Sequence, residues 1–175
     1  MTALTRILVF TGEGKGKTSA ALGMALRASG HGMRVLIVQF IKADPTSGEV
    51  RAVAGLPNVE IVQTGLGFLP PPADPKFAAH REAAERGLRL AREALASGRY
   101  QLVVLDEVCL AVARKLLGEE QVVEAVRHAA PGCSAVLTGR SCPPGLVALA
   151  DTATEMRSVK HAFDSGRPAQ KGIEF

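Results

Sequence analysis

The chain has 175 residues, 47% hydrophobic and 22% charged, which suits one globular domain, residues 1–175, without metal or disulfide crosslinks. No apolar run is long enough for a membrane span or a signal peptide, so we expect a cytoplasmic protein with no membrane partner. The formal net charge of +4 favours anionic ligands, but no run of Lys and Arg indicates a nucleic-acid partner.

The first predicted elements are a strand and a helix joined by a glycine-rich loop. Residues 6–10, RILVF, form a short β-branched run that is typical of a buried parallel strand. Residues 17–30 have the period of a helix that Gly30 ends. The apolar face of this helix is expected to contain Ala21, Leu22, Ala25 and Leu26.

Two more strands, a loop and a long helix follow. Residues 34–40 and 59–64 are apolar runs that predict the second and third strands. Residues 65–75, GLGFLPPPADP, contain four prolines, which prevent regular structure, so we expect a shaped loop here. The pattern of residues 75–98 then predicts the longest helix, with an apolar stripe of Ala84, Leu88, Ala91 and Leu95.

The second half of the chain continues the alternation of strands and helices. Residues 100–107, YQLVVLDE, predict a fourth strand that ends in two carboxylates, and a pair of helices follows. Residues 134–138 and 153–157 predict the last two strands, on either side of a helix at residues 144–150. Such alternation builds a parallel sheet covered on both faces. We therefore predict an α/β fold with an open, mostly parallel sheet and helices on both faces, of the RecA-like class that carries a phosphate-binding loop (P-loop).

Three groups of polar residues follow predicted strands and should meet in one site. They are the glycine loop after the first strand, Asp106 and Glu107 after the fourth, and Thr138 to Arg140 after the fifth. Ligands of open parallel sheets bind beyond the carboxyl ends of the strands. The convergence of these groups therefore predicts a binding site at this edge of the sheet.

The loop at residues 10–19, FTGEGKGKTS, is similar to a P-loop but has its glycines at unusual positions. The standard pattern places a glycine where this chain has Thr11. Glycines still allow successive backbone N–H groups to face phosphate oxygens, and the helix N-terminus adds a favourable dipole. Lys17 would supply a positive charge, and the Thr18 hydroxyl would bind Mg²⁺. A glycine-rich turn alone is weak support, whereas Gly-Lys-Thr between a strand and a helix is strong support.

Two interpretations stay open for the acidic pair and for Arg140. Asp106 and Glu107 can cap the next helix, bind Mg²⁺ directly or through water, or do both. Arg140 can neutralise triphosphate charge or be a simple surface residue.

The three cysteines lie far apart along the chain and form no C-x-x-C pair, so we expect small thiols rather than a zinc site or a disulfide.

Several longer stretches resemble one known family. They are FTGEGKGKTSAALGMALRASGHG, VLIVQFIK, GEVR, VVLDEV, LTGR and LADTATEMRSVKHAFDSGRPAQKGIEF. From about Arg6 to Phe175 the chain is similar to the ATP:corrinoid adenosyltransferases of bacterial vitamin B12 synthesis. The shifted glycine loop and the C-terminal motif KHAFDSG are the specific features of this resemblance.

The resemblance implies a reaction and its substrates. Members of the family transfer the 5′-deoxyadenosyl group of ATP to the Co(I) centre of a reduced corrinoid, and they release triphosphate. The corrinoid is cobalamin or cobyrinic acid diamide. ATP lies reversed relative to other P-loop enzymes, so that its C5′ faces the corrinoid. The family also implies Mg²⁺ as a cofactor, a reduced flavin protein as electron donor, and a homodimer.

The resemblance further implies which residues hold the triphosphate. Lys15 and Lys17, together with Mg²⁺, would stabilise negative charge on the leaving group. The loop that matches the family's triphosphate loop consists of Gly12, Glu13, Gly14, Lys15, Gly16, Lys17 and Thr18.

Other matched positions imply contacts with the metal, the nucleoside and the corrinoid. Thr18 and Glu107 would be the Mg²⁺ ligands, with Asp106 beside them. Arg27 would lie near the nucleoside. Phe68 would face the corrinoid and help to strip the lower axial ligand from cobalt, which makes Co(II) easier to reduce.

The chain departs from better-known members of the family in three places. Glu13 stands where they have asparagine, which makes the loop one charge less positive. Pro70 stands where they have an aromatic residue two positions after Phe68, and the chain has no tryptophan. They also carry an N-terminal helical extension that helps to cover the corrinoid, whereas this chain starts almost at its first predicted strand.

Two other functions fit the residues alone. A phosphoryl-transfer enzyme, either an ATPase or a small kinase, would use the same loop and Mg²⁺ site but release orthophosphate or ADP. A non-catalytic ATP-binding or RecA-like nucleic-acid module agrees with the fold and charge, but a single tyrosine and the missing basic run argue against it. For Phe68 the alternative to a corrinoid contact is a plug in the core.

Overall fold

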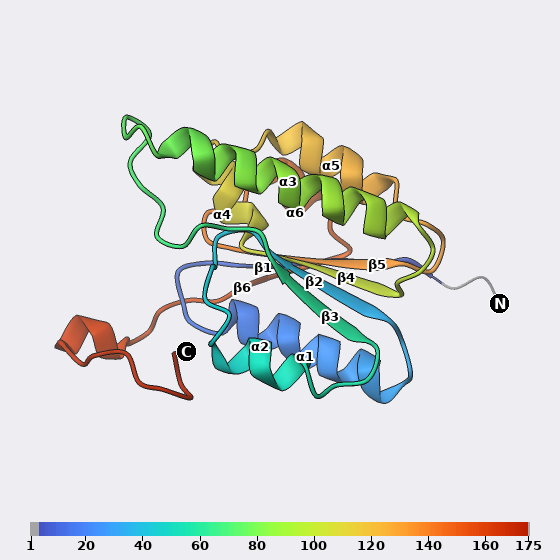
Figure 1. Ribbon diagram of the computed structural model, residues 1–175, viewed down its shortest axis with the longest axis horizontal. Coiled ribbons are helices and arrows are strands. Elements are labelled where there is room, and N and C mark those ends of the chain that lie inside the picture. The colour runs from blue at the N-terminus through green and yellow to red at the C-terminus, as the bar shows by residue number, and fades with distance from the viewer. Residues whose placement is uncertain (1–3, 175) are drawn as a thin grey trace.

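A computed structural model describes residues 4–174, which contain one six-stranded sheet (Figure 1). The strand order is β3-β2-β4-β5-β1-β6, and each neighbouring pair is parallel. The predicted open parallel sheet is therefore confirmed. The strands are β1 (Ile7–Thr11), β2 (Val35–Gln39), β3 (Val59–Gln63), β4 (Leu102–Asp106), β5 (Ser134–Thr138) and β6 (Thr152–Glu155).

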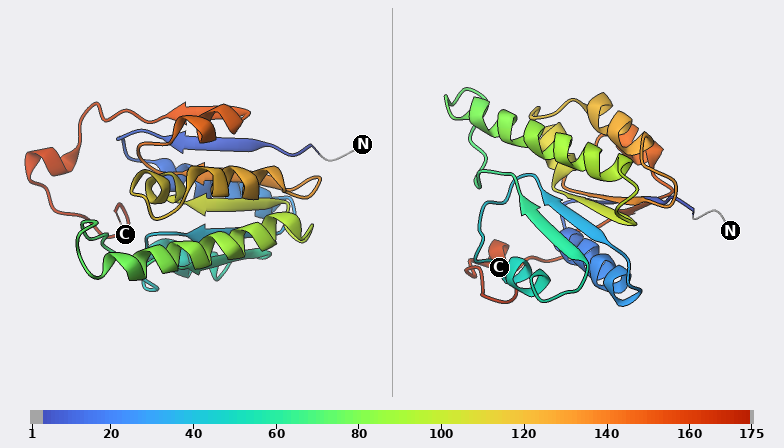
Figure 2. Two further views of the ribbon diagram at one scale, coloured as in Figure 1. Left: turned by 90° about the horizontal axis from the view of Figure 1, so that it is seen from above. Right: turned by 45° about the vertical axis from the view of Figure 1, so that its right-hand side comes forward.

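Helices cover both faces of this sheet, as Figures 1 and 2 show. One face carries α1 (Lys17–Gly30) and α2 (Gly48–Val53). The other face carries α3 (Phe77–Ala96), α4 (Val108–Ala113), α5 (Glu119–Arg127) and α6 (Pro144–Leu149). A short 3-10 helix, η1 (Ala162–Ser165), lies in the C-terminal tail. Each face has its own hydrophobic core, because strand side chains alternate between the two sides of the sheet.

The two long helices test the predicted apolar faces. The stripe of α3 is confirmed, since Ala84, Leu88, Ala91 and Leu95 are all buried. The face of α1 is partly different, because Leu26 is 57% exposed. This helix packs on the sheet through the small residues Ala21, Ala25 and Ala28, a line from which Leu26 is turned away. The six-residue helix α2 was not predicted.

The strand order brings the predicted site residues together. β5 lies between β1 and β4, with Phe10 opposite Thr138 and Gln39 opposite Asp106 in the register of neighbouring strands. All strands run in the same direction, so the loops after β1, β4 and β5 leave the same edge of the sheet. Figure 2 shows the C-terminal tail beyond this edge, on the side opposite the beginning of β1.

The segment of residues 65–75 is a loop without helix or strand, as its prolines predict. A hydrogen bond connects this loop to the segment after β2, because the Gly67 N–H donates to the Ile41 carbonyl over 2.8 Å. A side chain at Gly65 would collide with the backbone of Ile41. The loop is therefore held beside the carboxyl end of β2.

Between Leu4 and Glu174, no helix combines the length and the apolar character that crossing a membrane requires.

Candidate active site

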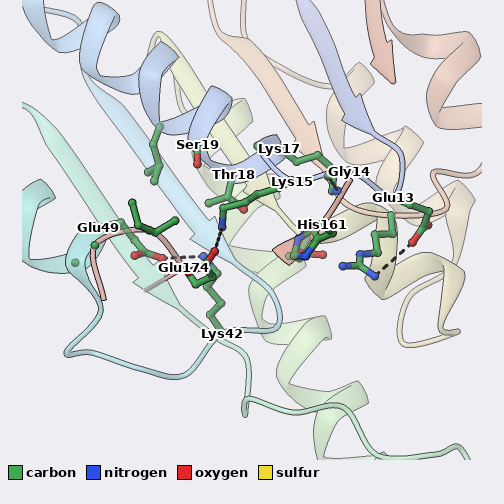
Figure 3. A pocket seen from close by; sticks show the side chains of 17 residues that line it. Glu13, Gly14, Lys15, Lys17, Thr18, Ser19, Lys42, Glu49, His161 and Glu174 are labelled. Carbon is green, nitrogen blue, oxygen red and sulfur yellow. Dashed lines mark hydrogen bonds and ion pairs between the residues drawn. The ribbon is translucent and has the colours of Figure 1, made fainter. Parts of the chain in front are cut away.

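A pocket of about 530 Å³ lies at the carboxyl ends of the strands (Figure 3). Its walls come from the P-loop, from the chain after β2, β4 and β5, and from the C-terminal tail. The residues that carry its chemistry are Glu13, Lys15, Lys17, Thr18, Lys42, Glu49, Glu107, Arg140, His161 and Glu174. Three segments that the sequence predicted to converge thus line one cavity.

The backbone angles and contacts of the P-loop explain the unusual positions of its glycines. Gly12 and Gly16 have φ of 94° and 118°, a region that side chains disfavour. The end of β6 passes against the loop, and the Gly14 N–H donates to the Met156 carbonyl over 2.7 Å. A side chain at Gly12 would collide with that same carbonyl, and one at Gly14 would lie 2.7 Å from the carbonyl carbon of Arg157. Glycine is therefore required where the loop meets the last strand.

Lys17 is held inside the loop by backbone carbonyls. Its Nζ donates to the Gly12 and Gly14 carbonyls over 2.6 and 2.7 Å. The side chain is buried, and this burial lowers the pKa of its ammonium group, with a smaller contribution from Arg140. A desolvated cation at the start of a helix is well suited to bind a phosphate group.

Asp106 is the polar centre of the site and is fully buried. Its Oδ1 accepts hydrogen bonds from the hydroxyl groups of Thr18 and Thr138, over 2.8 and 2.7 Å. Its Oδ2 accepts from the Gln39 amide over 3.0 Å and lies 3.9 Å from Lys42 Nζ. Because both oxygens are occupied, Asp106 joins four segments of the site and orients the Thr18 hydroxyl.

Glu107 has a different environment from its neighbour. Its backbone has φ 66°, and its N–H donates to the Thr138 hydroxyl over 2.9 Å. Burial, and then the charge of Asp106, raises the pKa of its carboxyl group. Its Oε2 is buried without a hydrogen-bond partner, and its side chain does not cap α4. The capping interpretation is therefore wrong for Glu107, and the carboxylate is available to a ligand in the pocket.

The donor atoms beside the P-loop fit Mg²⁺. Thr18 and Glu107 both line the pocket, and each offers an oxygen, the type of ligand that Mg²⁺ prefers. Within residues 4–174, no three His, Cys, Asp or Glu side chains form a complete metal cage. This sparse donor set is typical of Mg²⁺ sites, which use one or two protein ligands together with phosphate oxygens and water.

Two ion pairs join the P-loop to other walls of the pocket (Figure 3). The Arg140 guanidinium lies 3.3 Å from Glu13, and both side chains are exposed. Lys15 Nζ lies 3.5 Å from Glu174 in the C-terminal tail. The predicted triphosphate residues therefore lie together, with the carboxylate of Glu13 opposing the charge of Arg140.

Arg27 and Phe68 lie outside this pocket. Arg27 is an exposed residue in the last turn of α1, and the structure does not bring it to the P-loop. Phe68 is 93% exposed, so the alternative of a core plug is wrong. It lines a second pocket of about 530 Å³ together with Ile41, Leu69 and Leu110. The two pockets share Lys42, Glu49 and Glu174.

Sequence reasoning missed several residues that line the first pocket. Lys42 follows β2, and its Nζ lies 2.7 Å from Glu49 Oε1. The rule that ligands bind beyond strand ends could have identified Lys42, because it lies three positions after the strand. His161 and Glu174 reach the pocket from the tail, whose route no local pattern predicts.

Comparison with known proteins gives the same family as the resemblance seen in the sequence. The family model described as ATP:corrinoid adenosyltransferase BtuR/CobO/CobP matches residues 4–175. The corrinoid adenosyltransferase of Escherichia coli (strain K12) is 42% identical over 171 residues, which cover 97% of this chain and 85% of that protein. Corrinoid adenosyltransferase CobA of Salmonella typhimurium is 43% identical over 172 residues, with the same 97% and 85% coverage.

A more distant relative extends this result. The corrinoid adenosyltransferase of Sinorhizobium sp is 36% identical over 173 residues, which cover 97% of this chain and 79% of that protein. The match spans both the P-loop and the C-terminal tail that line the pocket. With this coverage and identity, the chain belongs to the ATP:corrinoid adenosyltransferase family.

Proposed function

We propose that this protein transfers the 5′-deoxyadenosyl group of ATP to the Co(I) centre of a reduced corrinoid in adenosylcobalamin biosynthesis, with release of triphosphate. The observation that carries this proposal, beyond family membership, is the pair of adjoining pockets. One is lined by the P-loop and the other by Ile41, Phe68 and Leu69, and they share Lys42 and Glu49. A reaction between a nucleotide and a large, mostly apolar ring needs such an arrangement.

In the proposed reaction the electron pair of Co(I) forms a bond to C5′ of the ribose. The C5′–O bond breaks, and its electron pair passes to the triphosphate. Lys17 and Lys15, both in the P-loop, would stabilise the negative charge that collects on this leaving group. ATP would lie with its triphosphate on the loop and its C5′ directed toward the pocket of Phe68.

Thr18 and Glu107 would hold Mg²⁺ beside the triphosphate. The support is the buried, unpartnered Oε2 of Glu107 and the lining of the same pocket by Thr18. When bound, Mg²⁺ neutralises charge on phosphate oxygens. Asp106 would act behind Thr18, because its oxygens already accept hydrogen bonds from Thr18, Thr138 and Gln39.

Phe68 would contact the lower face of the corrinoid and favour loss of the axial ligand. Its 93% exposure and its place in an apolar pocket support this role. The resemblance to the family supports two further parts of the proposal, namely a homodimer and a reduced flavin protein as electron donor. We also propose the cytoplasmic location that the sequence predicts. Arg27 near the nucleoside has only the resemblance in its favour.

One experiment separates adenosyl transfer from phosphoryl transfer. The protein is mixed with ATP, Mg²⁺ and chemically reduced cobalamin, and both the cobalamin spectrum and the phosphate products are followed. We expect inorganic triphosphate together with a light-sensitive cobalt–carbon product. Formation of ADP or orthophosphate without that product would instead identify an ATPase or a kinase.

A further inference from the structure

Two cysteines that are distant in sequence meet beside the candidate active site. The Sγ atoms of Cys109 and Cys142 lie 3.2 Å apart, and both residues are free thiols. Cys109 lies in the first turn of α4, two positions after Glu107. Cys142 lies between β5 and α6, two positions after Arg140. The pair therefore joins the two segments that carry these pocket residues.

The surroundings of the pair favour a bond between the two sulfurs. A disulfide has an S–S length of about 2.05 Å, so the sulfurs need to approach by about 1.2 Å. The backbone segments already pack tightly, because a side chain at Gly139 would lie 3.0 Å from Cys109 Cβ and 2.7 Å from the Leu110 nitrogen. Neither segment therefore has to cross open space to form the bond.

The third cysteine provides a contrast within the same chain. Cys133 is buried, and its Sγ has the neighbouring Ser134 carbonyl as its polar contact, at 3.9 Å. Among residues 4–174, no other cysteine sulfur forms a hydrogen bond with Cys133 Sγ. Cys133 is thus an internal control for reactions that require two adjacent thiols.

We propose that Cys109 and Cys142 form a redox-active dithiol that a small-molecule disulfide, of the glutathione disulfide class, oxidises to an intramolecular disulfide. Cys142 is only partly buried whereas Cys109 is fully buried, so the oxidant meets Cys142 first. The Cys142 sulfur, after losing its proton, attacks one sulfur of the oxidant and releases the first thiolate. The Cys109 sulfur then attacks Cys142 Sγ, releasing the second thiolate. Two protein thiols are oxidised, and one small disulfide is reduced to two thiols.

The new bond would restrain the turn that carries Arg140. The Cys142 N–H donates to the Thr11 hydroxyl over 3.2 Å, at the end of β1, so this turn also contacts the start of the P-loop. A disulfide would add a covalent connection from the same turn to α4. Oxidation would therefore reduce the independent motion of the Arg140 turn relative to Glu107.

This inference does not depend on the proposed adenosyl transfer, and its test uses no activity measurement. The full-length protein is incubated with glutathione disulfide, and its intact mass, free thiols and disulfide-linked peptides are determined. We expect a loss of the mass of two hydrogen atoms, a single remaining thiol at Cys133, and a peptide pair that joins Cys109 to Cys142. Dithiothreitol should restore the reduced mass.

Variants and physical measurements make the test specific. Cys133→Ser should oxidise as the wild type does, whereas Cys142→Ser should form no intramolecular disulfide. Oxidation should raise the melting temperature by several degrees, because the crosslink restricts the unfolded chain. It should also slow amide hydrogen exchange in residues 139–142. A stable mixed disulfide with glutathione, equal reaction of all three thiols, or no reaction in folded wild-type protein would each overturn the proposal.

Discussion

The Thr18 hydroxyl donates a hydrogen bond of 2.8 Å to Asp106, a residue 88 positions further along the chain. Asp106 also accepts from Thr138, so one carboxylate oxygen connects the P-loop, β4 and β5. The adjacent Glu107 carboxylate has an unpartnered oxygen. Two neighbouring acids thus have different tasks, one in positioning the Thr18 hydroxyl and one in facing a ligand.

This division of roles predicts different effects of two conservative substitutions. Glu107→Gln would remove the Mg²⁺ ligand that we propose, so it should raise the Mg²⁺ concentration for half-maximal activity by about tenfold or more. Asp106→Asn should change that concentration less but should destabilise the protein by roughly 1–3 kcal/mol, because it disturbs a buried hydrogen-bond network. Mg²⁺ titrations and thermal melts measure both effects. The roles are reversed if Asp106→Asn alone shifts the Mg²⁺ requirement.

A second prediction concerns stability and pH at Glu107. The folded protein raises the pKa of this carboxyl group above its ordinary value of 4.5, so folding favours the protonated form. The protonated Glu107 carboxyl group therefore stabilises the folded protein below pH 4.5, and this stabilisation is lost as the pH rises through the pKa of the folded state. Without Mg²⁺, Glu107→Gln should melt above the wild type near neutral pH and approach it in acid. A constant difference at all pH values would contradict this explanation.

Lys17→Ala should abolish measurable adenosyl transfer while leaving the fold intact. In the proposed reaction Lys17 stabilises the leaving group, so the loss of this buried charge is expected to lower the rate by about 10²–10³-fold or more. Lys15→Ala is a matched control, because Lys15 lies in the same loop but is exposed and paired with Glu174. Its effect should be smaller. Rates, circular dichroism and melting temperature are compared for the two variants, and near-normal turnover of folded Lys17→Ala would refute the assigned site.

Gly12 allows a test of why the loop has its unusual sequence. Gly12→Ala places a side chain at φ 94° against the Met156 carbonyl, and the strain should cost at least about 1–2 kcal/mol. Gly23→Ala is the control, since nothing lies within 4 Å of that position in α1. It should be neutral or stabilising by up to about 1 kcal/mol. Denaturant unfolding measures both, and equal stability of the two variants would contradict the role of the β6 contact.

Phe68→Ala should affect the reaction differently according to the cobalt state supplied. Preformed Co(I) needs only access and alignment, so its adenosylation should hardly slow. The coupled reaction from Co(II) should slow strongly, because reduction depends on loss of the axial ligand. Leu66→Ala, in the same loop and 48% exposed, is the control and should change neither rate. Since Phe68 is 93% exposed, the melting temperature should stay constant, and equal loss in both assays would exclude the corrinoid contact.

The sequence predicted most of the sheet because its signals are local. Each apolar run before a polar strand end, such as residues 102–106 before Glu107, became a parallel strand. The rule for ligands at strand ends then placed the P-loop, the acidic pair and Arg140 at one site; in the structure Glu107 and Arg140 line the pocket with the P-loop, and Asp106 is buried behind Thr18.

The parts that were missed depend on contacts between distant segments. The proximity of Cys109 and Cys142 follows from how α4 and the β5–α6 turn pack, which periodicity along the chain does not encode. The same is true of Glu174, whose tail returns to Lys15. For Leu26, the helical period correctly indicated a helix, but the choice of buried face depended on the small residues of α1.

The walls of the pocket come from nearly the whole length of the chain, from Glu13 to Glu174. During translation the P-loop therefore emerges from the ribosome long before Glu174. All six strands end by Glu155, so a nascent chain can assemble its sheet before the tail is made. The wall of the pocket that His161 and Glu174 provide would thus be added to a sheet that has already formed, and a chain cut before the tail would keep its core but lack these two pocket residues.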